Sequence, residues 1–204
     1  MQLSREPLLK PVPVRTLRPT QITVGLREVG EMQRRWRSRP QKKDIKFLER
    51  HLVPVVLGPR GDHYVLDHHH LCRALLHEGV REVLVTIVAD LGRLKKDAFW
   101  IYLDNRGWLH PYDEKGRRRP YADIPRELSD MVDDPFRSLA GAIRRAGGFA
   151  KDTTAFSEFL WADFFRRKIK RKKLEHDFDA VVKKAFVLAK SKDADYLPGW
   201  CGPS

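Results

Sequence analysis

Cysteine is scarce in this sequence, which has only Cys72 and Cys201 among its 204 residues. The two lie far apart and form no short C-x-x-C spacing, which argues against a disulfide framework and against a cysteine-based zinc site. An H-E-x-x-H segment, which would place two histidines and a glutamate on one helix, is also absent. We therefore expect no metal site of either kind.

Long apolar runs are absent as well. No stretch approaches the ~20 apolar residues that a membrane-spanning helix requires. Pro7, Pro11 and Pro13 interrupt the first residues of the chain, which have no apolar core of the kind found in signal peptides. These absences predict a cytoplasmic protein that does not contact membranes.

Negative charge is in the minority. The sequence has 27 acidic residues against 40 lysines and arginines, which gives a formal net charge of +13 at pH 7. Charged residues make up 33% and hydrophobic residues 42%, a balance typical of globular proteins rather than disordered ones. The positive excess favours an anionic partner, a nucleotide or a nucleic acid, without indicating sequence specificity.

Strand patterns cluster between residues 10 and 90. The β-branched run from Val53 to Leu57 is followed by the turn residues Gly58 to Gly61, which predicts a hairpin over 53–66. The run Val83 to Val88 lacks alternation, so we expect a strand that is buried on both faces. Helices are expected over residues 25–38, 41–50 and 68–78.

Helical patterns dominate the rest of the chain. We expect helices over residues 95–103, 125–132, 135–146, 153–170 and 174–190, with an aromatic loop region over 104–123. The predicted fold class is α+β. Its parts are a small mixed-sheet core in residues 10–92, an all-helical extension packed on it in 93–192, and an irregular tail in 193–204.

The run Asp67-His68-His69-His70-Leu71-Cys72-Arg73 carries the strongest chemical signal. It joins an apolar strand to a helix, and the unpaired N–H groups of a helix N-terminus form an anion site. Asp67 is expected to cap the helix, while three imidazoles and a guanidinium crowd the same end. A structural alternative remains, because consecutive helical side chains point about 100° apart and cannot all face one ligand.

Several segments resemble the ParB/sulfiredoxin superfamily, in which a motif between a strand and a helix binds the phosphates of a nucleotide. The similarity is greatest to the branch named putative ParB-like nucleases, and it covers about residues 10–167. The matching segments are Arg18-Pro19-Thr20-Gln21, Glu28-Val29, Asp67 with His69-His70 and Arg73-Ala74, Asp133 to Gly141, and Phe159 to Asp163. The resemblance therefore implies a ParB/sulfiredoxin-like core.

The sequence departs from this pattern at two positions. His68 stands where relatives have glycine, which adds a side chain where a phosphate would approach the backbone most closely. Cys72 does not occupy the position of the reactive cysteine of sulfiredoxins, and their Gly-Cys-His-Arg motif is absent. Reduction of sulfinic acid is therefore not expected.

The resemblance also implies roles for individual residues. Relatives that phosphorylate free serine pair the turn with an upstream glutamate as general base, so the catalytic candidates are Glu28, Asp67 and His70. An alternative for Glu28 is a surface ion pair with Arg27 or Arg34. The candidate phosphate- or nucleotide-binding residues are Arg18, Gln21, His68, His69 and Arg73.

Three functional hypotheses are compatible with these residues. The first is a nucleotide-binding enzyme, a nuclease or a phosphotransferase, that uses the Asp-His-His-His turn. The second is a non-catalytic DNA-binding module whose turn is structural or senses a nucleotide, and the third is a small-molecule or protein-interaction role. Nuclease chemistry would add Mg²⁺, for which Asp133 and Asp134 are the nearest acidic pair, although Asp134 also suits the cap of the next helix. The substrate and the oligomeric state stay open.

A second feature is the basic segment 166–173, in which seven of eight residues are cationic. Contacts to a nucleic-acid backbone are assigned to Lys168, Lys170, Arg171 and Lys172. The alternative is a solvated helix end, where cations also suit the C-terminal dipole.

Overall fold

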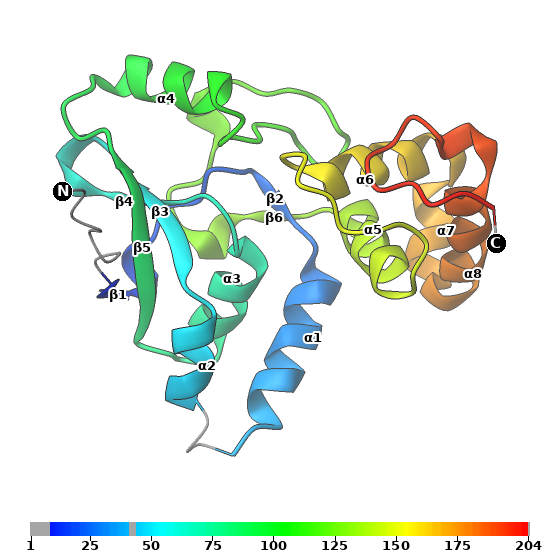
Figure 1. The fold of residues 1–204 in the computed structure, drawn as a ribbon, viewed down its shortest axis with the longest axis horizontal. Coiled ribbons are helices and arrows are strands. Elements are labelled where there is room, and N and C mark those ends of the chain that lie inside the picture. Colours follow the sequence, from blue (N-terminus) through cyan, green and yellow to red (C-terminus); the bar gives the residue numbers. More distant parts are fainter. Residues whose placement is uncertain (1–8, 41–43, 204) are drawn as a thin grey trace, which may run out of the picture.

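The computed structural model describes residues 9–40 and 44–203 and shows the expected α+β fold. Figure 1 divides into a sheet with its helices and, beside it, a group of helices near the C-terminus. The first part contains β1 (Leu9–Pro13), β2 (Thr23–Val24), α1 (Leu26–Arg37), α2 (Asp44–Arg50), β3 (Val53–Leu57), β4 (His63–Val65), α3 (His69–His77), β5 (Glu82–Asp90) and α4 (Lys96–Asn105). The second contains α5 (Pro135–Arg145), α6 (Ser157–Lys168), α7 (Arg171–His176) and α8 (Phe178–Lys190), with the short strand β6 (Val132–Asp133) leading into it.

The main sheet has the strand order β1-β5-β3-β4. The strands β3 and β4 form the hairpin expected over 53–66, and β3 lies parallel to β5. Helices α1 and α3 pack against one face, where Val55, Leu75 and Val85 are at most 1% exposed. Burial of each such side chain contributes about 1.5–3 kcal/mol. The first residues of the helix expected over 41–50 lie outside the described residues.

The expectation that β5 is buried on both faces is wrong. Val83 and Val85 point into the core, but Val88 is 48% exposed, so only one face of the strand is fully covered. The apolar run reflects the β-branched preference of a strand rather than two covered faces.

Helix α4 packs on the sheet part. Phe99 and Leu103 are fully buried, as expected, and they share a cluster with Val56 of β3. A boundary between core and helical extension at residue 92 stays a proposal, and this packing favours a later boundary.

The helices α5 to α8 have a core of their own. The buried Trp161 of α6 stacks on Phe149 with ring centroids 4.1 Å apart, and its indole N–H donates to the carbonyl of Pro198 at 2.8 Å. The C-terminal segment is irregular, as expected, yet it is packed: Ala194 and Leu197 are buried in this cluster. No helix among the described residues is long and apolar enough to cross a membrane.

Two expected helices differ from the structure. Residues 125–132 form only a short 3-10 turn, and the chain then pairs as β6 with the parallel strand β2. The helix expected over 174–190 is interrupted at Asp177, whose carboxylate accepts the N–H of Ala180 and caps α8. A capping side chain of this kind ends one helix and begins the next.

Candidate functional site

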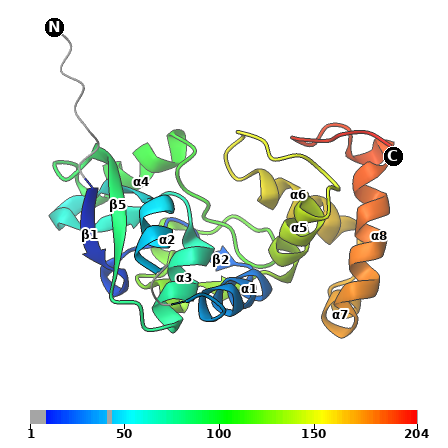
Figure 2. The same cartoon turned by 60° about the horizontal axis from the view of Figure 1, so that its bottom comes forward.

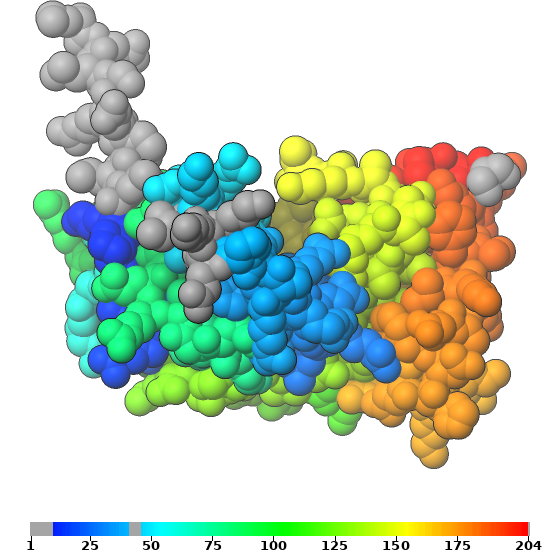
Figure 3. Space-filling model, turned by 90° about the horizontal axis from the view of Figure 1, so that it is seen from below, coloured from blue at the N-terminus to red at the C-terminus, as the bar shows by residue number. Residues whose placement is uncertain are grey.

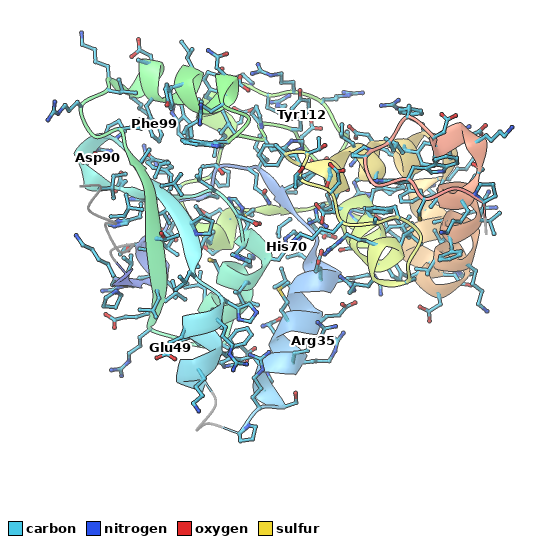
Figure 4. The ribbon with its side chains drawn as sticks, in the orientation of Figure 1. Arg35, Glu49, His70, Asp90, Phe99 and Tyr112 are labelled. Carbon is cyan, nitrogen blue, oxygen red and sulfur yellow. The ribbon has the colours of Figure 1, made fainter. Side chains whose placement is uncertain are left out.

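A cavity of about 430 Å³, here called the turn cavity, lies where the sheet part meets the helices α5 and α6. Its walls come from α1, from the turn Leu66–Leu71, from α5, and from the segment 151–159 that ends in α6. Figure 3 shows a hollow between the blue α1 and the yellow segment around residue 155, and Figure 4 places His70 at this junction. The Asp-His-His-His turn therefore faces one partly open cavity.

The helix α3 begins behind a strained residue. His68 is its N-cap and has φ of +69°, in the left-handed region where an L-residue costs about 1–2 kcal/mol. A glycine adopts this conformation without cost, so the glycine that the family resemblance implies at this position would avoid the strain. Asp67 is not the N-cap, which corrects our expectation: its Oδ1 accepts the N–H of His68 at 2.6 Å. No side chain caps α3, and its first N–H groups stay available to a ligand.

A second strained residue lies on the same cavity. Phe156, the N-cap of α6, has φ of +58° and likewise makes no side-chain cap. Among the described residues the non-glycine positions with positive φ are Arg60, His68 and Phe156, and the last two line the turn cavity. Such strain tends to cluster at functional sites.

The two buried histidines of the turn are neutral anchors. The backbone N–H of Thr20 donates to Nε2 of His69 at 3.2 Å, and that of Gly25 donates to Nε2 of His70 at 3.0 Å. Burial lowers the pKa of His69 to about 3 and lowers the pKa of His70 well below 6.5. His69 therefore fixes the loop before β2, and His70 fixes the turn between β2 and α1, as satisfied core histidines do.

Glu28 is buried at the junction and is 5% exposed. Arg137 donates to its Oε2 at 3.0 Å and Arg145 to its Oε1 at 3.1 Å. The alternative pairing with Arg27 or Arg34 is therefore wrong. Both carboxylate oxygens are already occupied by guanidinium groups from α5, so this arrangement binds α1 to α5.

Two predicted ligands do not line the cavity. Arg18 donates to the carbonyl of Arg126 at 2.9 Å, and Arg73 donates to two backbone carbonyls beyond α4, those of Leu128 at 2.8 Å and Met131 at 2.7 Å. Our placement of Arg18 and Arg73 beside a phosphate is corrected accordingly. Arg73 follows His69 by one helical turn, so it shares the inward face of α3.

Gln21 and Asp67 do line the turn cavity, together with His68. Gln21 is 4% exposed, and its Nε2 donates to the carbonyl of Thr23 at 2.8 Å. Burial lowers the pKa of His68. The turn and Gln21 thus meet in one cavity, as expected.

The sequence did not point to the cations on the opposite wall. These are Arg137, Arg144 and Lys151, and aromatic rings of Trp108, Phe156 and Phe159 also line the cavity. Arg137 is only 8% exposed, and its Nε has no hydrogen-bond partner among the described residues. The available signal was the segment Asp133 to Gly141, whose match to the family included this arginine.

The acidic pair next to α5 has structural contacts. Asp134 accepts the N–H of Phe136 at 3.0 Å and pairs with Arg166 at 2.6 Å, while Asp133 accepts the N–H of Leu26 at 2.8 Å. The N-cap interpretation of Asp134 is confirmed, and burial raises its pKa. Among residues 9–40 and 44–203, no group of three His, Cys, Asp or Glu side chains could hold a metal ion.

The basic segment lies away from the turn cavity. Lys168 pairs with Asp193 at 2.8 Å and Arg171 with Glu175 at 2.7 Å. Lys170 and Lys172 are exposed and make no ion pair with the part of the chain that the structure describes. Surface pairs of this kind contribute at most about 1 kcal/mol, so all four cations remain open to a partner.

The sequence profile of the family described as "Putative ParB-like nuclease" matches residues 10–167. The crystal structure of protein Atu1540 from Agrobacterium tumefaciens is 48% identical, covers 97% of this chain and 100% of its own, and superposes with a TM-score of 0.90. The C-terminally truncated chromosome-partitioning protein ParB from Caulobacter crescentus, complexed with CTP-gamma-S, is 9% identical over 91% of this chain and 94% of its own. Its TM-score of 0.33 supports no inference. No curated protein matches the chain.

Proposed function

Because the chain belongs to the family of putative ParB-like nucleases, we propose that the turn cavity binds the phosphate groups of a nucleotide. The observation that carries this proposal is the convergence of an uncapped helix N-terminus, that of α3, with Arg137, Arg144 and Lys151. A helix N-terminus attracts anions through its free N–H groups and its dipole. Charge-assisted hydrogen bonds from arginine strengthen the same preference.

The cavity also suits the rest of a nucleotide. Its volume of about 430 Å³ falls in the range of small-molecule sites, roughly 300–1,000 Å³. Trp108 and Phe156, which are half-buried, supply aromatic surface on which a base can stack. A ligand that presents both phosphate and a flat ring uses both halves of the lining.

Carboxylates line the cavity too, and they favour a magnesium-bound nucleotide. The charge of Glu28 is neutralised by Arg137 and Arg145. Oε1 of Glu158 lies 3.1 Å from Nε of Arg144. Asp67 is exposed and Asp152 is half-buried, and both line the cavity. Magnesium on nucleotide phosphates keeps several waters and takes one or two protein carboxylates, a role that these two residues fit.

Binding is better supported than catalysis by the predicted residues. Nε2 of His70 already accepts a backbone N–H, and both oxygens of Glu28 are held by arginines, so neither group is placed to accept a substrate proton. The nuclease or phosphotransferase hypothesis therefore depends on Asp67, the exposed carboxylate of the turn. We propose a nucleotide-binding module first and a phosphoryl-transfer enzyme second.

Isothermal titration calorimetry with CTP, ATP and inorganic phosphate, each with and without Mg²⁺, tests this proposal. We expect a nucleotide to bind more tightly than phosphate. Arg144→Gln should weaken it about tenfold or more, since a hydrogen bond to a charged group contributes about 1.5–3 kcal/mol. Lys183→Gln, which removes one exposed charge from α8, is the matched control.

Two outcomes would contradict the proposal. One is the absence of binding heat with either nucleotide. The other is an equal loss of affinity in Arg144→Gln and Lys183→Gln, which would show that only the net charge matters. Product formation by the wild-type protein that is lost in Asp67→Asn would place the enzyme hypothesis first.

A further inference from the structure

A second concave surface, here called the basic groove, lies at the other end of α6. Its volume is about 550 Å³. It is lined by segments far apart in the sequence, the loop 114–117 and the α6–α7 junction 166–171, together with Phe136 of α5. The cations that line it are Lys115, Arg117, Arg166, Arg167, Lys168, Lys170 and Arg171, against the single acidic residue Glu114.

Some of these cations hold the fold together. Arg166 pairs with Asp134 and with Asp163, so it is structural. Arg117, Arg167 and Lys170 are exposed, and they make no ion pair or side-chain hydrogen bond with residues 9–40 and 44–203. These three therefore carry positive charge that the described part of the protein does not neutralise.

The positions of the cations around the α6–α7 junction are unfavourable for helix stability. The last turn of α6 has Arg166, Arg167 and Lys168, which suit the negative end of its dipole. The first turn of α7, however, has Arg171, Lys172 and Lys173 and no acidic residue. Cations at this end of a helix are disfavoured by the dipole, so helix stability does not account for them.

The backbone directs this charge outward. Ile169 joins the two helices in an extended conformation and is 5% exposed, which anchors the junction in the core of the helical part. Lys168 and Lys170 flank it and are exposed. Figure 2 shows α7 at the far edge of the molecule beside α8, away from the sheet.

We propose that the basic groove binds the sugar-phosphate backbone of duplex DNA, with little sequence preference. Charge supplies the attraction, as in non-specific DNA binding. Single-strand binders also need aromatic platforms for the bases, but the aromatic residue of this groove, Phe136, is 2% exposed. A membrane surface fits less well, because Phe136 and Ile169 are buried and leave no apolar side chain here to insert.

The structure refines the residues assigned from the sequence. Lys168, Lys170 and Arg171 line the basic groove, whereas Lys172 does not. Lys115 and Arg117 come from a loop that the sequence gave no reason to connect with the basic segment. A groove with cations on both walls can hold one phosphate ridge of a duplex between them.

Fluorescence anisotropy with a labelled mixed-sequence duplex of about 20 base pairs, titrated at several salt concentrations, tests the proposal. The groove variant is Arg117→Gln, Arg167→Gln and Lys170→Gln together. The control variant is Arg35→Gln, Lys183→Gln and Lys184→Gln, which removes the same charge from exposed positions on α1 and α8. The groove variant should lose about tenfold or more in affinity, and its salt slope should fall by about 2–3, near 0.9 for each lost phosphate contact.

The control variant should bind DNA within about threefold of wild type with an unchanged salt slope. Equal effects of the two variants would overturn the proposal, because they would show a general charge effect. The proposal would also be overturned if the wild-type protein bound anionic phospholipid vesicles but not DNA, and the groove variant no longer bound the vesicles. Nucleotide titration of the same variants separates this inference from the turn cavity, since neither should alter nucleotide affinity.

Discussion

The backbone N–H of Gly25 and Nε2 of His70 form a hydrogen bond of 3.0 Å that ties the start of α1 to the start of α3. Because Nε2 accepts this bond, the proton of the neutral ring is on Nδ1. Gly25 is also close to α5: a Cβ at this position would lie 2.5 Å from Oγ of Ser138. Three helices therefore meet at one histidine and one glycine, directly beside the turn cavity.

Substitution of His70 by alanine should destabilise the protein. It leaves the N–H of Gly25 buried without an acceptor, which costs about 1–3 kcal/mol. His70→Gln is the matched control, since its amide oxygen can take the place of Nε2 and should restore part of the loss. Urea unfolding followed by circular dichroism measures both. Equal stability of His70→Ala and wild type would show that the hydrogen bond contributes nothing.

Three neutral histidines, the buried His69 and His70 and the half-buried His110, should make the protein less stable in acid. His69 and His110 have pKa values lowered by burial to about 3, and that of His70 is lowered in the same direction. In the unfolded chain they take up protons below about 6.5, whereas the folded chain resists this until about pH 3. Stability is thus fully present above pH 6.5 and falls progressively below it, by about 1.4 kcal/mol per pH unit for each such histidine.

The pH dependence can be assigned by two variants. The ring of His110 stacks on Phe159 at 3.9 Å, so His110→Phe keeps the aromatic packing and removes one titrating group. The slope of the unfolding free energy against pH should then decrease by the contribution of one proton, about 1.4 kcal/mol per pH unit. His77→Gln, at an exposed position of α3, is the control. A slope that does not change in His110→Phe would refute this assignment.

Replacement of His68 by glycine should stabilise the protein by about 1 kcal/mol, because glycine adopts the left-handed conformation without strain. It should also improve nucleotide binding, since phosphate could approach the backbone of the turn more closely. Arg60→Gly is the control: Arg60 has φ of +67° and is exposed in a different turn. It should raise stability in thermal unfolding without changing nucleotide affinity. A similar affinity change in both variants would contradict the second expectation.

Glu28→Gln should cost about 3 kcal/mol of stability, because it leaves the buried Arg137 without its counter-charge. In the double variant Glu28→Gln and Arg137→Met, much of this cost should disappear. Chemical unfolding of the single variants Glu28→Gln and Arg137→Met and of the double variant gives the coupling energy between the two residues. A fully stable Glu28→Gln that has lost only turnover would instead support the general-base role that the sequence suggested.

Local signals were enough to predict much of the fold. The turn residues after Leu57 predicted the hairpin, and the spacing of apolar residues predicted α3 and the buried positions Phe99 and Leu103. The helix predicted over residues 125–132 is absent because contacts with a segment distant in the sequence determine their conformation. Val132 pairs with Thr23, a partner that no short sequence window contains.

Only one wall of the turn cavity could be predicted from the sequence. The turn is local to the strand-to-helix motif, and Gln21 was added through the resemblance of Arg18-Pro19-Thr20-Gln21 to the family, so the sequence could bring the two together. Arg144 and Lys151 come from the far helical part, and only the folded chain places them opposite the turn. Arg73 was predicted to lie beside the phosphate because it is close to His70 in the sequence. The helix instead directs its side chain to the carbonyls of Leu128 and Met131.

The walls of the turn cavity have a consequence for folding kinetics. The core of α5 to α8 is built from residues close together in the sequence, and local contacts of this kind form fast. The pairing of Thr23 with Val132 and the bond between Glu28 and Arg137 close much longer loops, which slows their formation. During refolding, helical signal should return before nucleotide binding does. The nucleotide binding that we propose should then be acquired late, because a nascent chain that has not yet reached α5 lacks Arg137 and Arg144 of the cavity wall.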